Sequence, residues 1–383
     1  MKKDILIIAY SLLHRDPRIL RQIEAFKNNY HLQTIGYSSS NVNDVVHFNI
    51  PEKPKIKIRK YLNALRILTH QYKKTLYSFF SIKKLLEYDY KEPDLIVAND
   101  WDGLFLAGIL VEKKHWKSKI YFDAHEYSPK EFDTLKWKVF FRPLINYVLK
   151  KMRNRFAVMS TVCPSLARMY ETYFHFKPHT VYTVTNATSF EKTLLPAPVS
   201  DKIKLIHHGA AMPARQLETM IDMMQFLPSK KYELFFMLVK TNNAKYYDTL
   251  VNRAKNYSNI HFLEPVLFNK IPSYTNQFDI GVYILNNAII NNKYALPNKF
   301  FEFIQARLAI AVGDSFEMRQ YIQKYNLGIA AEKNDACLLA KKILSLSTAD
   351  IMRFKENAHK YAQKLSAEKN ITLLQEIAKV ALS

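Results

Sequence analysis

Short apolar runs alternate with amphipathic segments of helix length along most of the chain. In the first half, the apolar runs cover residues 5–9, 32–37, 95–98, 120–122, 156–160 and 181–185. A second series follows at residues 203–206, 234–239, 260–263, 280–284 and 308–312, and helical segments alone close the chain at 349–364 and 368–382. Strands of this length separated by helices are typical of parallel sheets wrapped by helices. The pattern predicts an α/β protein with two parallel sheets.

The restart of this pattern predicts a boundary between two domains. Pro196, Pro198 and Ser200 mark residues 194–202 as an interdomain linker. We therefore expect one domain over residues 1–193 and another over residues 194–365. A length of 383 residues with 48% hydrophobic side chains is enough for two large cores.

Cysteine usage and the lack of long apolar runs narrow the cellular setting. Cys163 and Cys337 stand far apart with no metal-ligand spacing around them, so neither a disulfide framework nor a zinc site is expected. Asp4 interrupts the first apolar run, which is too short for a secretory signal. Arg142 breaks the aromatic segment 139–149, and no other run reaches the length of a membrane span. These features favour a cytoplasmic protein without a membrane-spanning segment.

The chain is strongly basic, with 56 Lys and Arg against 34 Asp and Glu and a net charge of +22. Ten basic residues and no acidic residue lie from Lys53 to Lys84, interleaved with tyrosine, leucine and phenylalanine. Seven basic residues and no acidic residue lie from Lys136 to Arg155, again with aromatic residues between them. Both segments suit the anionic inner leaflet of a membrane, and both equally suit the solvated faces of ordinary helices.

Polar residues follow directly after most of the apolar runs. In open parallel sheets, ligands bind at the carboxyl ends of the strands, so such residues are the first candidates for a site. They are Ser11, His14, Asn99, Asp100, Asp123, His125, Glu126, Ser160 and Asn186 in the first half, and His207, His208 and Arg215 in the second. One alone would be an ordinary capping residue, but their number predicts a polar cleft.

The segment 295–306 carries the strongest local signal for chemistry. Pro297 is expected at the first position of a helix, where the free backbone N–H groups of that turn favour an anion. Lys299 could neutralise a phosphate, and Glu302, about a turn further along, could accept hydrogen bonds from ribose hydroxyls. The alternative is an ordinary amphipathic helix whose Lys299 and Glu302 face water.

Several segments, in order along the chain, resemble glycosyltransferase family 4 and its relatives. The run 296–310, in which Pro297-Asn298-Lys299 opens a helix bearing Glu302, resembles the donor-binding signature of that family. The other segments that resemble the family are 16–18, 94–100, 123–126, 186–187, 208–218 and 262–282. Each is weak alone, but their order extends the resemblance over nearly the whole chain.

The resemblance implies a GT-B fold, in which two Rossmann-like domains with parallel sheets face each other across a cleft. It places the acceptor on the first domain and a nucleotide diphosphate sugar on the second, and it returns a final helix, residues 366–383, to the first domain. It also implies a retaining transfer that needs no metal and no cofactor. The chain departs from the family in two places, because Tyr294 occupies the position of the first glutamate and Val239-Lys240-Thr241 replaces a glycine-rich turn.

The donor site implied by the resemblance comprises His208, Gly209, Arg215, Lys240, Pro297, Asn298, Lys299 and Glu302. Arg215 is the first candidate for the clamp on the departing diphosphate, because its planar fork binds two phosphate oxygens at once. Its alternative is an exposed arginine in the first turn of a helix. The catalytic candidates are His125, Glu126 and Arg215, and the acceptor-binding candidates are Arg18, Asp100 and Glu126. Asp16 is interpreted first as a helix cap ahead of Pro17.

We therefore predict a retaining glycosyltransferase that moves a sugar from a UDP- or GDP-linked donor to a glycan or lipid-linked acceptor in bacterial surface polysaccharide synthesis. An anionic membrane surface is a predicted partner through the two basic segments, and a specific nucleic acid is not. Two alternatives stay open. A nucleotide-sugar epimerase or hydrolase of the same fold would turn over donor without an acceptor, and a non-enzymatic basic protein would bind nucleic acid.

Overall fold

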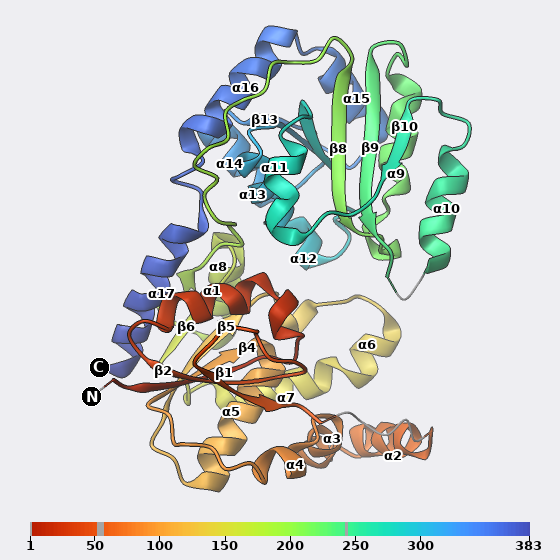
Figure 1. Ribbon diagram of the computed structural model, residues 1–383. Coiled ribbons are helices and arrows are strands. Elements are labelled where there is room, and N and C mark those ends of the chain that lie inside the picture. The colour runs from red at the N-terminus through yellow and green to blue at the C-terminus, as the bar shows by residue number, and fades with distance from the viewer. Residues whose placement is uncertain (1, 52–56, 242–243) are drawn as a thin grey trace. The chain divides into compact units, whose positions relative to one another are not determined.

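The computed structural model describes residues 2–51, 57–241 and 244–383, and its packing divides the chain into two compact units. Unit 1 comprises Met1–Thr185 together with Asn370–Ser383, and unit 2 comprises Asn186–Lys369. Each unit holds one parallel β-sheet with helices on both faces (Figure 1). Both are therefore doubly wound α/β units, as the alternation of apolar runs and helical segments predicts.

The sheet of unit 1 has seven strands in the order β3-β2-β1-β4-β5-β6-β7. Their bounds are β1 (Asp4–Ile8), β2 (His31–Gly36), β3 (Val45–Asn49), β4 (Leu95–Asn99), β5 (Lys119–Ala124), β6 (Val158–Thr161) and β7 (Tyr182–Thr183). The larger helices of the unit are α1 (Pro17–Phe26), α5 (Asp100–Lys114), α7 (Arg142–Met152) and α8 (Pro164–Phe174). Every residue of β1 and β4 is buried, because helices cover both faces of a parallel sheet.

The last helix of the chain, α17 (Ala367–Leu382), belongs from Asn370 onward to unit 1. Its Leu374, Ile377, Ala378 and Ala381 are buried in the same core as Ile5 of β1. In Figure 1 this blue helix lies beside the red N-terminal strand, and Lys3 Nζ donates to the carbonyl of Leu382 at 3.4 Å. The expected return of the final helix to the first domain is confirmed.

The sheet of unit 2 has six strands in the order β10-β9-β8-β11-β12-β13. Their bounds are β8 (Ile203–Ala210), β9 (Tyr232–Val239), β10 (Ile260–Leu263), β11 (Ile280–Tyr283), β12 (Ala309–Val312) and β13 (Gly328–Ala330). The helices around it are α9 (Glu218–Met223), α10 (Ala244–Ala254), α11 (Ile271–Thr275), α12 (Ile290–Lys293), α13 (Asn298–Gln305), α14 (Phe316–Tyr325), α15 (Ala336–Leu344) and α16 (Thr348–Tyr361).

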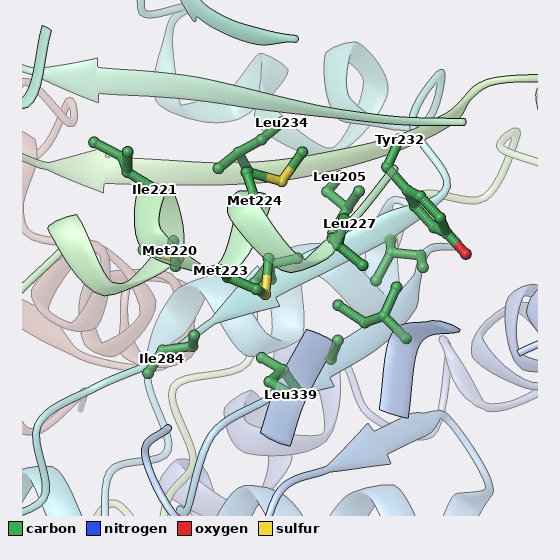
Figure 2. Close-up of a cluster of buried hydrophobic side chains, with 14 of the residues drawn as sticks. Leu205, Met220, Ile221, Met223, Met224, Leu227, Tyr232, Leu234, Ile284 and Leu339 are labelled. Carbon is green, nitrogen blue, oxygen red and sulfur yellow. The ribbon is translucent and has the colours of Figure 1, made fainter. Parts of the chain in front are cut away.

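The core of unit 2 fills the space between one sheet face and the helices that cover it. Figure 2 shows Leu205 of β8 and Leu234 of β9 packed against Met220 and Met223 of α9, and Leu339 of α15 belongs to the same cluster. All five side chains are fully buried. Methionine adapts its shape to irregular gaps, which suits the short helix and the turn that follow β8. This core holds β8 in place, and β8 carries the candidate site.

The strands expected from the apolar runs are confirmed, but β3 and β13 were missed. Both are edge strands, and neither carries a continuous apolar run that would distinguish it from a loop. The division between the units falls after Thr185, eight residues before the expected boundary at 193/194. Residues 186–193 pack with unit 2, since the buried Arg307 donates from Nη2 to the carbonyl of Glu191 at 2.6 Å.

The two basic segments form a group of short helices in unit 1. The first segment contains α2 (Lys57–Leu68), α3 (Tyr72–Phe79) and α4 (Ile82–Leu86), and its residues 53–56 lie outside the described part of the chain. The second contains α6 (Leu135–Phe140) and α7. Within the residues that the structure describes, no helix combines the length and the apolar character that a membrane span requires.

Candidate functional site

The donor-site candidates of unit 2 gather at the carboxyl end of β8. This strand contributes His207, His208 and Gly209, and the short 3-10 turn Pro213–Arg215 follows it. The opening turns of α13 contribute Lys299 and Glu302. The structure therefore brings together residues that are about ninety positions apart in the sequence.

Gly209 adopts φ +119°, a backbone conformation that side chains with a Cβ rarely reach. A Cβ built on this residue would lie 3.3 Å from Lys299 Nζ and 3.6 Å from Arg215 Nη1. The bare backbone of Gly209 thus lets two cations approach the same point of the chain. Two cations beside an uncovered stretch of backbone make a suitable site for a diphosphate.

His207 positions the ammonium group of Lys299. The imidazole Nδ1 lies 2.9 Å from the carbonyl oxygen of Val282, so this nitrogen carries the proton and donates it. Nε2 is then an acceptor, and Lys299 Nζ donates to it at 3.3 Å. Burial, followed by the charge of Lys299, holds the pKa of His207 well below its ordinary value. A neutral imidazole with this tautomer orients Lys299 without neutralising it.

Lys299 is a buried amino group whose positive charge, when protonated, has little fixed compensation. Lys299 is only 6% exposed, and its Nζ lies 4.4 Å from the centre of the Tyr283 ring. Burial and repulsion by Arg215 hold the pKa of Lys299 well below its ordinary value, against the opposing effect of Glu302. Across the described residues, neither Lys299 nor Arg215 forms an ion pair with a carboxylate. An incoming anion would supply the missing negative charge.

His208 and Glu302 form a second contact in this cluster. The distance from His208 Nε2 to Glu302 Oε2 is 3.5 Å, and both residues are at most 3% exposed. Burial, Lys299 and Arg215 lower the pKa of His208 to about 3, so the imidazole is neutral and the contact is not an ion pair. His208 Nε2 has no hydrogen-bond partner among the described residues. Such a buried polar atom is suited to bind a ligand.

The start of α13 differs in one detail from the sequence prediction. Pro297 is the N-cap residue, with φ −80° and ψ 162°, and the helix begins at Asn298. The carbonyl of Pro297 accepts from the N–H of Phe300 at 3.1 Å, which is the first bond of the helix and the reason that Pro297 lies one position earlier. The alternative of a solvated helix face is excluded, because Lys299 and Glu302 are both buried.

The remaining donor candidates lie around this cluster. Arg215 is half-buried at the end of its 3-10 turn, ahead of α9, and its Nη1 donates to the carbonyl of Ala210 at 3.3 Å. Lys240 follows β9, is exposed, and holds its Nζ 4.6 Å from the centre of the Tyr247 ring. Tyr294, at the position of the missing glutamate, packs edge-on against Phe316. Arg215 therefore joins the cluster at Gly209, whereas Lys240 packs on α10.

The candidates of unit 1 centre on His125, which follows β5. Its Nδ1 lies 3.1 Å from Asp100 Oδ2, its Nε2 lies 3.3 Å from Asp123 Oδ2, and its N–H donates to Asp100 Oδ1 at 2.9 Å. Asp100 begins α5 with φ 55°, and Gln22 of α1 donates to Asp123 at 2.8 Å. The ends of the neighbouring strands β4 and β5 thus place one histidine between two carboxylates.

His125 is an imidazolium ion. Burial alone would lower its pKa, but the charges of Asp100 and Asp123 outweigh burial and the repulsion of Arg18, and they raise the pKa to about 9. The same interactions hold the pKa of both carboxylates below the ordinary value in spite of burial. Arg18 is half-buried on α1 close enough to lower the pKa of Asp100, so these three candidates share one network.

Two acidic residues near this network were missed by the sequence reasoning. Burial and the charge of Asp100 raise the pKa of Asp102 to about 7, and burial with the charges of Glu126, Asp100 and Asp102 raises the pKa of Glu131 to about 8. A carboxyl group that titrates near neutral pH can take up or release a proton during a reaction. Asp102 lies two positions after Asp100 and could have been found by that spacing, but Glu131 lies in a loop without a pattern.

Glu126 and Asp16 complete the placement of the candidates. The side chain of Glu126 is exposed, and its main-chain carbonyl accepts from the hydroxyl of Tyr170 at 2.6 Å. The carboxylate of Asp16 accepts from the N–H of Arg18 at 3.1 Å at the start of α1. The interpretation of Asp16 as a helix cap is confirmed.

Solved structures similar to the whole chain support the fold. The sucrose-phosphate synthase of Thermosynechococcus elongatus has a TM-score of 0.73 at 14% sequence identity, over 99% of this chain and 98% of that chain. Anabaena HepE in complex with UDP-glucose has a TM-score of 0.71 at 12% identity, over 98% and 99%. WaaG, a glycosyltransferase involved in lipopolysaccharide biosynthesis, has a TM-score of 0.62 at 12% identity, over 97% and 99%.

No family model and no curated protein matches the chain in sequence. At identities this low, the structural similarity bears on the fold alone. The two doubly wound units and the returning C-terminal helix are those of the GT-B fold, which confirms the expected fold class.

Proposed function

We propose that this protein is a retaining glycosyltransferase that moves a sugar from a UDP- or GDP-linked donor to a glycan or lipid-linked acceptor. The proposed setting is bacterial surface polysaccharide synthesis at the cytoplasmic face of a membrane. Support comes from the GT-B fold, from a fold neighbour that was solved with UDP-glucose and from another that takes part in lipopolysaccharide biosynthesis. The observation that carries the proposal is the pair of cations, Lys299 and Arg215, at the bare backbone of Gly209.

In this proposal, the donor diphosphate binds between Lys299 and Arg215. The guanidinium of Arg215 takes two phosphate oxygens, and the turn after Pro297 presents the backbone N–H groups of Asn298 and Lys299 to the same anion. Glu302 accepts hydrogen bonds from the ribose hydroxyls, and His208 Nε2 binds the sugar or the phosphate. Lys240 extends the basic surface toward the donor.

The chemical role of these cations is to stabilise charge that develops as the reaction proceeds. When the bond between the sugar and the diphosphate breaks, the leaving group gains negative charge and the sugar becomes oxocarbenium-like. Fixed cations in a buried setting stabilise that charge without reorganising at the moment of reaction. We infer that Lys299 and Arg215 perform this role without a metal or a cofactor.

We assign acceptor binding to the network of unit 1. Asp100, Glu126 and Arg18 would bind acceptor hydroxyl or phosphate groups, and His125 would hold Asp100 in position for them. Both ring nitrogens of His125 are donors in the imidazolium form, so its role is hydrogen bonding and not proton abstraction. Glu126 is the exposed carboxylate of the group and the candidate for proton transfer.

The test is the thermal stability of the purified protein with UDP, GDP, ADP, CMP and their sugars. At a concentration of about a hundred times its Kd, a ligand should add about 2.7 kcal/mol of stability, a shift of some degrees in Tm. We expect one nucleoside diphosphate to stabilise the wild type and Glu332→Ala, an exposed glutamate paired with Lys342, but not Glu302→Ala. If no nucleotide shifts Tm, the transferase proposal fails.

A second assay separates the transferase from an epimerase or hydrolase. The nucleotide sugar that carries the base identified by the thermal panel is incubated with the enzyme, with and without membrane glycolipid extract. Release of nucleoside diphosphate that depends on the extract supports transfer. Equally fast turnover without it would assign the chain to the other reaction class.

A further inference from the structure

Helix α2 exposes most of its described apolar side chains and buries a polar one, Asn63. Tyr61, Leu65 and Leu68, which recur at helical spacing, are 79%, 58% and 62% exposed. The side of the helix that packs on the protein carries Asn63 and Ile67, both only 5% exposed. A surface helix ordinarily has the reverse arrangement, with its apolar stripe toward the core. The exposed stripe therefore marks α2 as a helix that meets an apolar partner.

The two basic segments, which lie about fifty residues apart in the sequence, meet in the structure. The ring of Tyr72 in α3 lies 5.7 Å from the ring of Tyr147 in α7, measured between centroids. Phe79 of α3 stacks on Phe141 at 6.3 Å. Aromatic side chains of both segments thus join them into one surface of unit 1, in which α2, α3 and α4 lie next to one another (Figure 1).

A cavity of about 1190 Å³ lies within this surface and is lined by residues of α2, α3, α4, α5 and α7. Among the residues that the structure describes, its basic lining residues are Arg66, Lys73, Lys74, Lys83, Lys84 and Lys113, and its one acidic lining residue is Glu87. Lys73 pairs with Glu112 at 3.3 Å. In the described part of the chain, no ion pair with a carboxylate is found for Lys74, Lys83, Lys84 or Lys113. The cavity therefore concentrates positive charge that the protein itself does not balance.

We propose that this cavity binds the phosphate-bearing head groups of anionic membrane lipids while α2 inserts its apolar stripe among the lipid chains. The inference deepens the membrane part of the proposed function and rests on it for the location of the acceptor. Basic side chains near an anionic leaflet each favour binding, and apolar side chains on the same element reach the hydrocarbon boundary. Tyrosine suits the interface, because its ring is apolar and its hydroxyl is polar.

The charge and the apolar stripe together select a lipid over other anions. A nucleic acid would use the lysines but would leave Leu65 and Leu68 in water. An apolar protein partner would cover the stripe but would leave a cavity of uncompensated lysines beside it. An anionic lipid provides both phosphate oxygens and hydrocarbon, so both features are used at once.

The test is sedimentation of the full-length protein with vesicles of phosphatidylcholine, with and without phosphatidylglycerol, in the absence of nucleotide sugar. One variant replaces Lys74, Lys83, Lys84 and Lys113 by glutamine. A matched control makes the same change at four exposed lysines elsewhere in the chain, Lys341, Lys360, Lys364 and Lys379. A third variant, Leu65→Ser with Leu68→Ser, removes two exposed apolar side chains of the stripe.

We expect the wild type to bind phosphatidylglycerol vesicles and not pure phosphatidylcholine. The cavity variant should bind at least tenfold more weakly, the control variant within about twofold of the wild type, and the leucine variant about tenfold more weakly. Equal losses in the cavity and control variants would overturn the cavity as a site, and unchanged binding of the leucine variant would overturn insertion of α2. Tighter binding to DNA than to vesicles at physiological salt would also overturn the proposal.

The proposed transferase is tested separately on the same variants. The Tm shift with a nucleoside diphosphate involves unit 2, and all substituted cavity residues belong to unit 1. The cavity variant should therefore keep the nucleotide shift of the wild type. Vesicle binding without any nucleotide shift would refute the transferase and support the lipid site. A nucleotide shift without vesicle binding would refute the lipid site and support the transferase.

Discussion

The charged clusters of the two units differ in how their charge is balanced. In unit 1, the imidazolium of His125 lies between Asp100 and Asp123 at 3.1 and 3.3 Å, so the charges compensate each other within the protein. In unit 2, Lys299 and Arg215 approach the same glycine, and the hydrogen-bond acceptor of Lys299 is a neutral histidine. A compensated buried network holds its geometry without a ligand, whereas uncompensated buried cations gain most when an anion binds.

The charges of the unit 1 cluster are therefore balanced without a ligand, whereas the unit 2 cluster lacks the negative charge that a ligand would supply. Substitutions in unit 1 should act first on stability, because removal of the imidazolium leaves the buried carboxylate of Asp123 without its cation. Substitutions in unit 2 should act first on ligand binding and turnover, because the cations there already repel each other. Five experiments test this contrast, and they are given from the largest expected effect to the smallest.

Removal of the imidazolium should have the largest effect. His125→Asn leaves the buried Asp123 without the imidazolium, while Asp100, whose side chain is 37% exposed, keeps Arg18 nearby. Loss of the buried His125–Asp123 pair should cost about 3–5 kcal/mol of unfolding free energy in unit 1. His175→Asn is the matched control, since His175 is exposed at a helix end with φ 56°, a conformation that asparagine tolerates. Urea unfolding at pH 6 measures both variants, and a cost below about 1 kcal/mol for His125→Asn would contradict the buried charge network.

The same network predicts how stability depends on pH. The pKa of His125 is raised from an ordinary 6.5 to about 9, so its contribution is fully present below pH 6.5 and is lost as the pH rises through about 9. The wild type should therefore lose about 3 kcal/mol between pH 6 and pH 9.5, and His125→Asn should lose much less. A parallel loss in both proteins would place the titration elsewhere.

Arg215→Ala should give the next largest effect, on turnover. Loss of one charged donor from a leaving-group site lowers the rate by about 10² to 10³. Arg253→Ala is the control, because Arg253 lies in the same unit and pairs with Asp222 at its surface. The measurement is the release of nucleoside diphosphate at saturating donor. A decrease of less than about threefold would remove Arg215 from the clamp.

Gly209→Ala should weaken donor binding about tenfold and should destabilise unit 2 by about 1–3 kcal/mol. The backbone at φ +119° disfavours a side chain, and the added Cβ would meet Lys299 Nζ at 3.3 Å. Ala210→Gly, at the next position, adds no atom and serves as the control. Titration of the nucleoside diphosphate by calorimetry checks the result. Unchanged affinity would show that the two cations do not share the space at Gly209.

The smallest effect is the pH dependence of nucleotide binding. Burial and Arg215 hold the pKa of Lys299 well below its ordinary value, and a bound diphosphate would raise it. Binding should thus take up a proton at pH values between these two pKa values, and the affinity should fall by at most tenfold per pH unit as the pH rises there. Calorimetry in two buffers of different ionisation enthalpy measures the uptake. Lys299→Met should abolish it, and equal uptake in both proteins would assign the proton to another group.

The sequence determined most of the strands, the class of fold and most members of both clusters. Buried parallel strands need continuous apolar runs, and polar residues at their carboxyl ends recur at predictable places, so Asp100, His125 and His208 were found from the pattern. Lys299 was found from the segment 295–306, where Pro297 opens a helix. The edge strands β3 and β13 were not found, because an edge strand needs no such run. Glu131 was not found either, since its raised pKa depends on burial and on Glu126, Asp100 and Asp102.

Only the tertiary structure decided which of these residues are charged, and which of them meet. In the sequence, Lys299 and Glu302 are equally compatible with a solvated helix face. In the structure they are part of a buried site, because α13 packs against the end of β8. His125 and His207 illustrate the same point. Both follow apolar runs of the sequence, yet His125 is cationic and His207 is neutral. A side chain's type and spacing are local properties of the sequence. Its protonation depends on burial and on neighbours that the fold brings from distant positions.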